Sequence, residues 1–257
     1  MQILDCTFRD GGYYTNWNFT NKLLDEYLKT VAKLPISIVE LGYLSHNKDF
    51  NGPFYHLNNN FLKTCKKKLN KKQKIYAMIN AKEIKNANQL IQLLKETHKN
   101  IDGVRFAISP YDVEKFLPFI KKASKKFQKI SFNVNLMYLS KWYKDLNFAK
   151  KTLRKLTGQV ETISIVDSYG ALQPNEISNF VKKIKEKNLK LGCHFHNNCG
   201  LALANTLSAV DAGCEVADTT FKGMGRGAGN AETEMLIALK NPIKPKISSF
   251  DISNLID

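Results

Sequence analysis

Short runs of apolar and β-branched residues alternate along this chain with longer segments in which apolar residues recur every three or four positions. Runs of the first kind predict buried β-strands, and segments of the second kind predict amphipathic helices. The predicted strands are Ile3–Thr7, Ser37–Leu41, Ile75–Ile79, Gly103–Ala107, Ile130–Leu136, Thr162–Asp167, Lys190–His196 and Glu215–Thr220. The predicted helices lie near 21–33, 59–70, 84–98, 111–126, 144–156, 175–187, 200–212 and 232–239.

Eight strand and helix pairs in regular alternation predict a parallel (β/α)8 TIM barrel, a fold of the α/β class. The chain has 257 residues, and one such barrel typically takes about 250. No linker, sequence repeat or low-complexity tract divides it. We therefore expect a single domain spanning residues 1–257.

Polar and charged side chains follow the predicted strands at their C-terminal ends, where TIM barrels carry their active sites. From the first strand to the loop after the eighth, these residues are Arg9, Asp10, Tyr13, Glu40, His46, Arg105, Asn135, Asp167, His194, His196, Arg226 and Asn230. Their recurrence at one end of the barrel predicts a polar active site there.

His194 and His196 lie two residues apart in a predicted strand, so their side chains point to the same face. With Asp10 they would form a site of two imidazoles and one carboxylate with open positions for a chelating substrate. Without a metal, the two histidines are unrelated polar residues at a strand end, and Asp10 caps the turn formed with Gly11 and Gly12.

Composition argues against several other classes of protein. The hydrophobic fraction is 43%, and no apolar run approaches the length of about 20 residues that crosses a bilayer. The N-terminus does not resemble a secretory signal. Five cysteines without CxxC spacing argue against a disulfide framework. We expect a cytoplasmic protein without a membrane span.

The net charge of +16 raises the possibility of a nucleic-acid partner. The lysine clusters lie on or beside several separate predicted helices and lack interleaved aromatic residues, so solvated helix faces explain them and no nucleic acid is expected. Only four basic residues are arginine, and Arg9, Arg105 and Arg226 fall at strand ends or in the last loop. A guanidinium there suits a carboxylate or enolate oxygen, which indicates an anionic substrate.

Five segments of the chain resemble the DRE-TIM metallolyase superfamily, and they read LDCTFRDGGY, VELGY, VDSYGALQP, CHFHNNCGLALAN and GMGRGAGNAETE. The superfamily contains 4-hydroxy-2-oxovalerate aldolase, 3-hydroxy-3-methylglutaryl-CoA lyase, and the isopropylmalate and homocitrate synthases. The resemblance extends from residue 4 to about residue 240.

The resemblance implies that Asp10, His194 and His196 bind a divalent cation, with Asn230 as a further ligand. We expect Mn²⁺. Zn²⁺ also suits imidazole and carboxylate ligands, and Mg²⁺, which prefers oxygen ligands, serves some of the similar proteins.

The resemblance also implies roles for residues around the metal. Arg9 would stabilise the enolate that the members share, Glu40 matches the signature acid of the second strand, and Asp167 matches a substrate-site carboxylate. The predicted substrate-binding residues are Arg105, Asn135 and Arg226.

Two departures from the resemblance narrow the prediction. No cysteine follows Cys214, where coenzyme A lyases have a catalytic cysteine, and the loop after the eighth strand reads GAGNA as in the oxovalerate aldolases. Tyr13 stands where those aldolases have a catalytic histidine. A phenol has an ordinary pKa of about 10 and is a weak base, so we expect either Tyr13 or His46 to transfer the proton. Alternatively, Tyr13 stacks on the substrate or packs a loop.

The sequence therefore predicts a divalent-metal-dependent aldolase, a carbon–carbon lyase that acts on a 2-oxo acid through a pyruvate-type enolate. The alternatives are a Claisen-type synthase or lyase that uses an acyl-CoA, and a barrel that serves as a non-catalytic binding module. The expected partners are a small 2-oxo acid and an aldehyde or acyl-CoA, with a homodimer by analogy. The sequence ends at Asp257 without the C-terminal extension of longer relatives, so channelling to a dehydrogenase is not expected.

Overall fold

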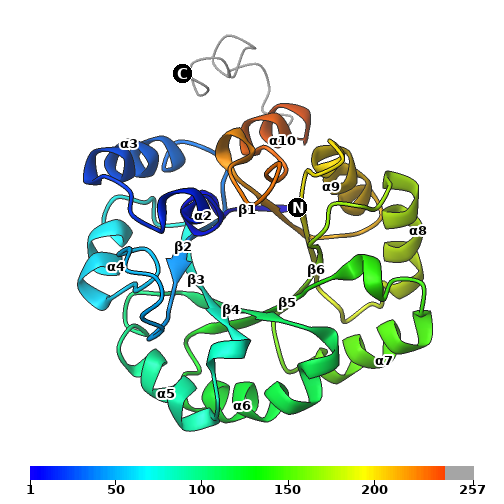
Figure 1. Cartoon of the computed structure of the whole chain (residues 1–257), viewed down its shortest axis with the longest axis horizontal. Helices are drawn as coiled ribbons and strands as arrows, with labels where there is room; N and C mark the ends of the chain where they lie inside the picture. The colour runs from blue at the N-terminus through cyan, green and yellow to red at the C-terminus, as the bar shows by residue number, and fades with distance from the viewer. Residues whose placement is uncertain (241–257) are drawn as a thin grey trace.

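Eight parallel strands pair in the order of the sequence, and the last pairs with the first, so the sheet closes into a barrel (Figure 1). The computed structural model describes residues 1–240. The strands are β1 (Gln2–Asp5), β2 (Ile38–Tyr43), β3 (Lys74–Asn80), β4 (Gly103–Ile108), β5 (Ser131–Leu136), β6 (Thr162–Asp167), β7 (Leu191–Phe195) and β8 (Val216–Thr219). The predicted (β/α)8 architecture is confirmed.

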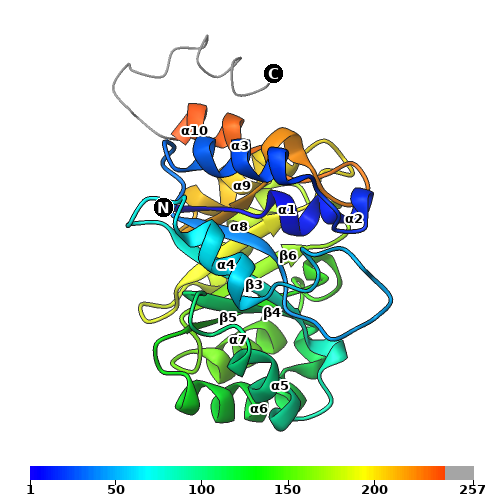
Figure 2. The same ribbon diagram turned by 90° about the vertical axis from the view of Figure 1, so that its left-hand side faces the viewer.

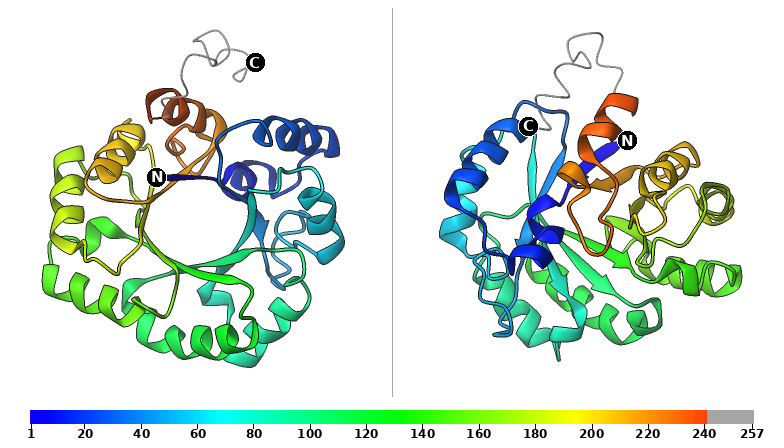
Figure 3. Two further views of the ribbon diagram at one scale, coloured as in Figure 1. Left: turned by 180° about the vertical axis from the view of Figure 1, so that it is seen from behind. Right: turned by 45° about the horizontal axis from the view of Figure 1, so that its top comes forward.

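Helices surround the barrel on its outside, as the views from the front and from behind show (Figures 1 and 3). They are α3 (Asn21–Val31), α4 (Asn59–Lys66), α5 (Ala87–Lys95), α6 (Val113–Lys126), α7 (Leu146–Leu156), α8 (Pro174–Ile184), α9 (Ala202–Asp211) and α10 (Thr233–Lys240). None of these described helices is long and apolar enough to cross a lipid bilayer.

Helix α7 shows how the sequence forms these elements. The side chain of Asp145 accepts a hydrogen bond from the backbone of Phe148 and caps the first turn. Ala149, Leu153 and Leu156 are spaced three or four residues apart and are buried against the barrel. Burial of each leucine contributes about 2 kcal/mol, so packing holds the helix on the sheet.

The barrel interior is apolar at one end and charged at the other. Leu4, Ile38, Tyr76 and Val216 form an apolar cluster together with the thiol of Cys6. Two residues further along several of these strands, the inward positions carry buried charged groups, because side chains on one face alternate with period two. The charged layer thus lies between the apolar floor and the open end of the strands.

Two short helices, α1 (Thr7–Asp10) and α2 (Gly12–Thr15), directly follow β1 (Figure 2). The prediction that Thr7 ends the first strand was wrong, because the carboxylate of Asp5 accepts the Thr7 N–H at 3.1 Å and starts a helical turn. The backbone N–H of Asp10 then bonds to the carbonyl of Cys6 at 2.9 Å. This turn places Arg9 and Asp10 in the wall of the barrel mouth.

Candidate active site

A cavity of about 250 Å³ opens at the C-terminal ends of the strands. Seven residues that the sequence singled out line it together: Arg9, Asp10, Tyr13, Asn135, His194, His196 and Arg226. They come from the β1, β5, β7 and β8 ends of the barrel, so the fold brings together groups that are more than 200 residues apart in the sequence.

Asp10 and the two histidines lie side by side in the wall of this cavity. Asp10 Oδ2 is 3.2 Å from His194 Nε2, and the imidazole rings of His194 and His196 are 5.3 Å apart. Two ligands about 2.1 Å from one ion and at right angles to each other lie about 3.0 Å apart. The Asp10 and His194 spacing therefore fits a shared cation. The Cys6 thiol also lies within 4.8 Å of both ligand atoms.

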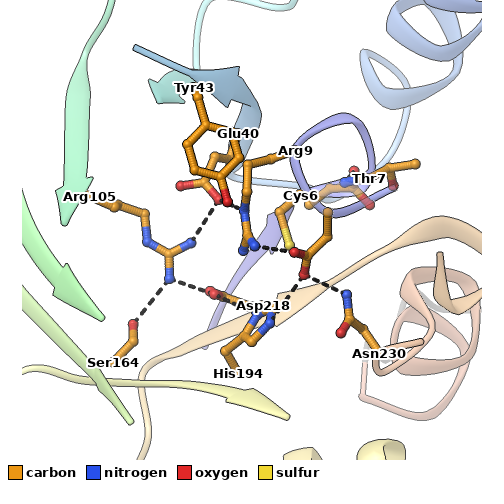
Figure 4. Close-up of polar contacts among 12 residues, drawn as sticks. Cys6, Thr7, Arg9, Glu40, Tyr43, Arg105, Ser164, His194, Asp218 and Asn230 are labelled. Atoms are coloured by element: carbon orange, nitrogen blue, oxygen red, sulfur yellow. Dashed lines mark hydrogen bonds and ion pairs between the residues drawn. The ribbon is translucent and has the colours of Figure 1, made fainter. Parts of the chain in front are cut away.

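His194 has a carboxylate at each of its ring nitrogens. Its Nδ1 is 3.1 Å from Asp218 Oδ2 (Figure 4), while its Nε2 faces Asp10. When a neutral imidazole donates Nδ1–H to Asp218, the lone pair on Nε2 points toward a carboxylate oxygen. A second proton on the ring or a cation shared with Asp10 resolves that conflict, and a carboxylate behind a metal-binding histidine fixes its tautomer.

Protonation states favour the same assignment. Burial, and then the neighbouring charge of His194, lower the pKa of His196 to about 4, so its lone pair is free near neutral pH. Burial raises the pKa of Asp10, but the Arg9 guanidinium outweighs it and holds this pKa well below its usual range. Asp10 is therefore an anion, as a metal ligand must be.

Asn230 completes the predicted ligand set next to the cavity. Its Nδ2 donates to Asp10 Oδ2 at 2.7 Å, and its backbone forms a β-bridge with His196. The Oδ1 atom is buried and accepts no hydrogen bond from any group in residues 1–240. A buried acceptor without a donor needs a partner, and a cation held by Asp10 would be one.

A chain of alternating charges runs beneath the cavity (Figure 4). Arg9 Nε donates to Glu40 Oε2 at 2.8 Å, and Arg105 Nη1 approaches the same oxygen at 3.4 Å. Arg105 Nη2 then donates to Asp218 at 2.5 Å and to Ser164 at 3.3 Å. Because Asp218 contacts His194, the chain links the guanidinium of Arg9 to a predicted metal ligand through paired buried charges.

This chain changes the roles predicted for two residues. Arg105 is 2% exposed and Glu40 is fully buried, and neither lines the cavity. Arg105 was predicted to bind substrate, but its guanidinium is engaged by Glu40, Ser164 and Asp218. Glu40 holds Arg9 in place, and Arg9 alone of these charged groups reaches the cavity.

His46 and Asp167, both predicted as catalytic, do not line the cavity. His46 is 3.0 Å from Glu96, its side chain is 48% exposed, and it borders a separate hollow. Asp167 Oδ2 accepts hydrogen bonds from the backbone of the loop at 171–172, at 2.8 and 2.9 Å. Its neighbours Val166 and Ser168 line the cavity instead, so its side chain points away.

Several polar residues line or support the cavity although the sequence predicted no role for them: Tyr43, Asn80, Lys82, Tyr138, Ser168 and Asp218. Asp218 could have been predicted, because it lies two residues after Val216 in a predicted strand and therefore points to the same inward face. Lys82 lies between a predicted strand and a predicted helix, and no pattern in the sequence singled it out. Tyr43 lies beyond an irregularity in the pairing of β2 with β3, which sequence periodicity does not reveal.

The loop after β8 packs over the mouth of the cavity. The guanidinium carbon of Arg226 lies 4.9 Å from the centre of the Tyr13 ring, and Tyr14 donates a hydrogen bond to the carbonyl of Gly227 at 2.9 Å. These contacts join the loop to α2. One rim of the cavity is therefore made by the first and last loops of the barrel.

Comparison with known proteins identifies the family of this chain. The HMGL-like family model matches residues 1–255. The chain belongs to the HMGL-like family. Members of this family, which is part of the DRE-TIM metallolyase superfamily, generally use a divalent metal ion. The predicted superfamily and the predicted class of enzyme, a carbon–carbon lyase, are confirmed.

Some curated relatives of this HMGL-like chain match nearly all of it at low identity, and others match a short segment at higher identity. Oxaloacetate decarboxylase of Mycobacterium tuberculosis is 25% identical over 258 residues, covering 99% of this chain and 74% of that protein. 4-Hydroxy-2-oxovalerate aldolase of Pelotomaculum thermopropionicum is 47% identical, but over only 79 residues, 30% of this chain and 23% of the enzyme. The matches to such aldolases thus span about a quarter of their length.

Solved structures show the same barrel. The N-terminal domain of a presumed aldolase from Bacteroides vulgatus superposes with a TM-score of 0.90 at 34% identity, covering 100% of this chain and 85% of that chain. HMG-CoA lyase of Bacillus subtilis superposes with a TM-score of 0.74 at 17% identity, covering 99% and 89%. The second likeness shows the fold alone.

Proposed function

We propose that this protein is a divalent-metal-dependent aldolase that cleaves or forms a carbon–carbon bond of a 2-oxo acid through a pyruvate-type enolate. One observation carries the proposal. Asp10, His194, His196 and the Arg9 guanidinium face the same small cavity at the C-terminal end of the barrel. A chelating anion bound in this cavity would contact both the cation held by the predicted ligands and the guanidinium of Arg9.

Asp10, His194 and His196 would hold the cation, with Asn230 Oδ1 beside them, and Mn²⁺ is the ion we propose. When bound, a divalent cation polarises the 2-oxo group and neutralises negative charge that develops on its oxygen. Nη2 of Arg9 is a buried donor without a hydrogen-bond acceptor among the described residues. It is ready to donate to a substrate oxygen, and this interaction strengthens as that oxygen gains charge.

The size of the cavity supports small reactants. Pockets for drug-sized ligands usually hold about 300–1,000 Å³, whereas this one holds about 250 Å³. A 2-oxo acid and a short aldehyde fit that scale. This favours the aldolase over the acyl-CoA alternative, in which a long cofactor would have to lie outside the cavity.

Decarboxylation of oxaloacetate is a second candidate reaction through the same enolate. The relative that matches nearly the whole chain carries that name. Lys82 and Arg226 also line the cavity, in which Asp10 is the one carboxylate among the described lining residues. Positive charge at the rim suits a substrate with a second carboxylate.

Deuterium exchange tests the proposal. The Mn²⁺-loaded protein is incubated with pyruvate in deuterated water, and deuterium in the methyl group is measured by mass spectrometry. We expect exchange that is lost on chelation and in the His194→Ala variant, because enolate formation needs the cation. Exchange on acetyl-CoA but not on pyruvate would support the Claisen alternative, and absence of both would contradict the proposal.

Release of carbon dioxide separates the two candidate reactions. Oxaloacetate and a 4-hydroxy-2-oxo acid are supplied in turn, and carbon dioxide or aldehyde is measured against a blank with free Mn²⁺. Aldehyde release supports the aldolase. Carbon dioxide release above the blank, without aldehyde, supports the decarboxylase.

A further inference from the structure

We propose that Tyr43 is a catalytic residue whose phenol donates the proton that converts the enolate to product, and that Tyr13 restores this proton from solvent. This inference rests on the proposed function, because it needs the enolate. It assigns the proton transfer to a residue of β2 that the sequence did not single out.

The backbone of β2 presents Tyr43 to the cavity. Residues three apart in a regular strand point to opposite faces, yet Glu40 and Tyr43 both lie next to Arg9 (Figure 4). The pairing of β2 with β3 shifts register between these two residues, as at a β-bulge, and this turns Tyr43 inward. Tyr43 consequently lines the cavity although it is only 6% exposed.

Aromatic neighbours hold the Tyr43 ring in this position. It stacks on Tyr55 with ring centres 4.8 Å apart and meets Trp17 edge to face at 5.6 Å. Its backbone N–H donates to the carbonyl of Phe54 at 2.8 Å, and its carbonyl accepts from Leu57 at 3.1 Å. A ring packed against two other aromatic rings keeps its hydroxyl at a fixed point, as proton transfer requires.

The hydroxyl groups of Tyr43 and Tyr13 lie 3.4 Å apart, and either can donate to the other. No other hydrogen bond holds the Tyr43 hydroxyl within residues 1–240, so it can also face a substrate. Tyr13 is 41% exposed and thus reaches solvent. The two phenols form a path from the buried wall of the cavity to water.

The Tyr43 phenol carries the proton to be donated. Burial raises its pKa well above the ordinary value, so the phenol stays protonated near neutral pH. Arg9 is near enough that its charge and that of Tyr43 act on each other's pKa. The phenol therefore lies close to the guanidinium that we expect to bind the enolate oxygen, whereas the guanidinium itself does not give up a proton.

The proton balance is simple. In aldol cleavage the substrate hydroxyl releases its proton to solvent as it becomes the aldehyde, and the electron pair of the broken carbon–carbon bond is left in the enolate. A carbon–hydrogen bond then forms as the Tyr43 O–H bond breaks, and the Tyr43 phenolate takes the proton of Tyr13. Water reprotonates Tyr13, so the proton taken from solvent balances the proton released by the hydroxyl, and no other reactant is needed. In the synthetic direction each transfer runs in reverse.

Tyr43→Phe tests the inference, because it removes the hydroxyl and keeps the ring. General acid catalysis typically contributes about 10²–10⁴-fold, so we expect deuterium exchange into pyruvate to fall by about 10² or more. Mn²⁺ affinity, measured by calorimetry, should stay within about twofold, because no ligand changes. Tyr13→Phe should lower exchange less, since water can reach Tyr43 in its place. Tyr143→Phe, which removes a hydroxyl bonded to Glu176 away from the cavity, is the control.

The outcomes distinguish the inference from the function. If Tyr43→Phe exchanges pyruvate at the wild-type rate, the assignment of Tyr43 is overturned while the proposed function stands. If exchange and Mn²⁺ affinity fall together, Tyr43 has a structural role and the assignment is also overturned. If the wild-type protein does not exchange pyruvate at all, the proposed function itself has failed.

Discussion

Asp218 and Asp10 act on His194 from opposite sides of its ring. The Asp218 carboxylate also takes a hydrogen bond from Arg105, so it is fixed before it orients the imidazole. Outer carboxylates of this kind typically raise metal affinity by about 10–100-fold. Without Asp218, Nδ1 of the buried His194 ring would lose its hydrogen-bond partner. The metal site that we propose would therefore depend on a residue outside the predicted ligand set.

Asp218→Asn tests that dependence. We expect Mn²⁺ affinity to fall by about 10–100-fold, because the amide removes the charge that orients His194 and leaves Arg105 less well paired. Asp25→Asn is the matched control, since Asp25 pairs with Lys29 and Lys68 at the surface. Calorimetric titration measures both variants. Equal affinities in the two would show that Asp218 does not support the metal site.

The pH dependence of metal binding follows from the protonation of His194. Burial lowers the pKa of His194, but the hydrogen bonds to Asp10 and Asp218 outweigh it, so this pKa is raised above its ordinary value. His196, with its pKa lowered to about 4, and Asp10 are already in their binding forms at pH 6. A cation must therefore displace one proton, from His194, when the pH is below the raised pKa.

We expect Mn²⁺ affinity to fall about tenfold per pH unit below the pKa of His194. Calorimetry at pH 6 in two buffers of different ionisation enthalpy counts the protons released per ion. One proton is the expected result. Release of two would show that His196 is also protonated in the metal-free protein, against the effect of its burial.

Among the elements, the loop after β8 sets the position of Asn230. The loop turns back at Gly229, whose φ of +89° favours glycine, and a Cβ there would lie 2.0 Å from the carbonyl oxygen of Gly223. The next residue is Asn230, and the Gly229 carbonyl accepts from the backbone of Asn197 at 2.7 Å. A side chain at Gly229 would therefore move the loop away from the metal ligands.

Two alanine variants, Gly229→Ala and Gly158→Ala, distinguish the effect of a steric clash at the new Cβ from the effect of backbone strain alone. Gly158 has a similar φ of +75°, but no described atom lies within 4 Å of the point that a Cβ would occupy there. Gly158→Ala should cost only the left-handed strain of about 1–2 kcal/mol. We expect Gly229→Ala to cost more in the free energy of unfolding, measured in urea, and to weaken Mn²⁺ binding as well. Unchanged Mn²⁺ affinity would show that the loop does not position Asn230.

For the whole molecule, the sequence predicted the barrel and much of its mouth, because both depend on local patterns. Strand and helix periods predicted the eight units. Asp10, His194 and His196 line one cavity, and their role as metal ligands stays a prediction. The direction of a side chain at a strand end was harder to predict. Neighbouring residues of a strand point to opposite faces, so an error of one residue reverses the predicted direction of a side chain. Asp167 accepts a hydrogen bond from a loop, whereas the next residue, Ser168, lines the cavity.

Ion pairs and hydrogen bonds between residues far apart in the chain could not be predicted from the sequence either. Arg105 looked like a free substrate-binding cation because its partners, Glu40 and Asp218, are 65 and 113 residues away. The helical start of α1 depends on the side chain of Asp5, which in the sequence reads as the middle of a strand. These features follow from closing the barrel, and closure is where the first and last parts of the chain meet.

Asp5 connects several of the segments that meet where the barrel closes. Its carboxylate accepts hydrogen bonds from the backbone of Thr7 in α1, from Tyr27 in α3 at 2.5 Å, and from Thr233 in α10 at 2.6 Å. Helices α3 and α10 lie next to each other outside β1 (Figures 1 and 2). One buried group thus joins segments that are up to 228 residues apart.

Asp5→Ala should accordingly destabilise the whole molecule. Thr233 can still donate to Thr219 at 2.7 Å, so two donors, the Thr7 N–H and the Tyr27 hydroxyl, lose their acceptor. Each buried donor left without its acceptor costs about 1–3 kcal/mol, which predicts a loss of about 2–6 kcal/mol in the free energy of unfolding. Asp145→Ala is the comparison, because it removes only the cap of α7 and should cost about 1 kcal/mol. Urea unfolding measures both. Because Asp5 also starts the turn that carries Arg9 and Asp10, the Asp5 variant should bind Mn²⁺ more weakly, whereas equal losses in the two variants would show that barrel closure does not depend on this carboxylate.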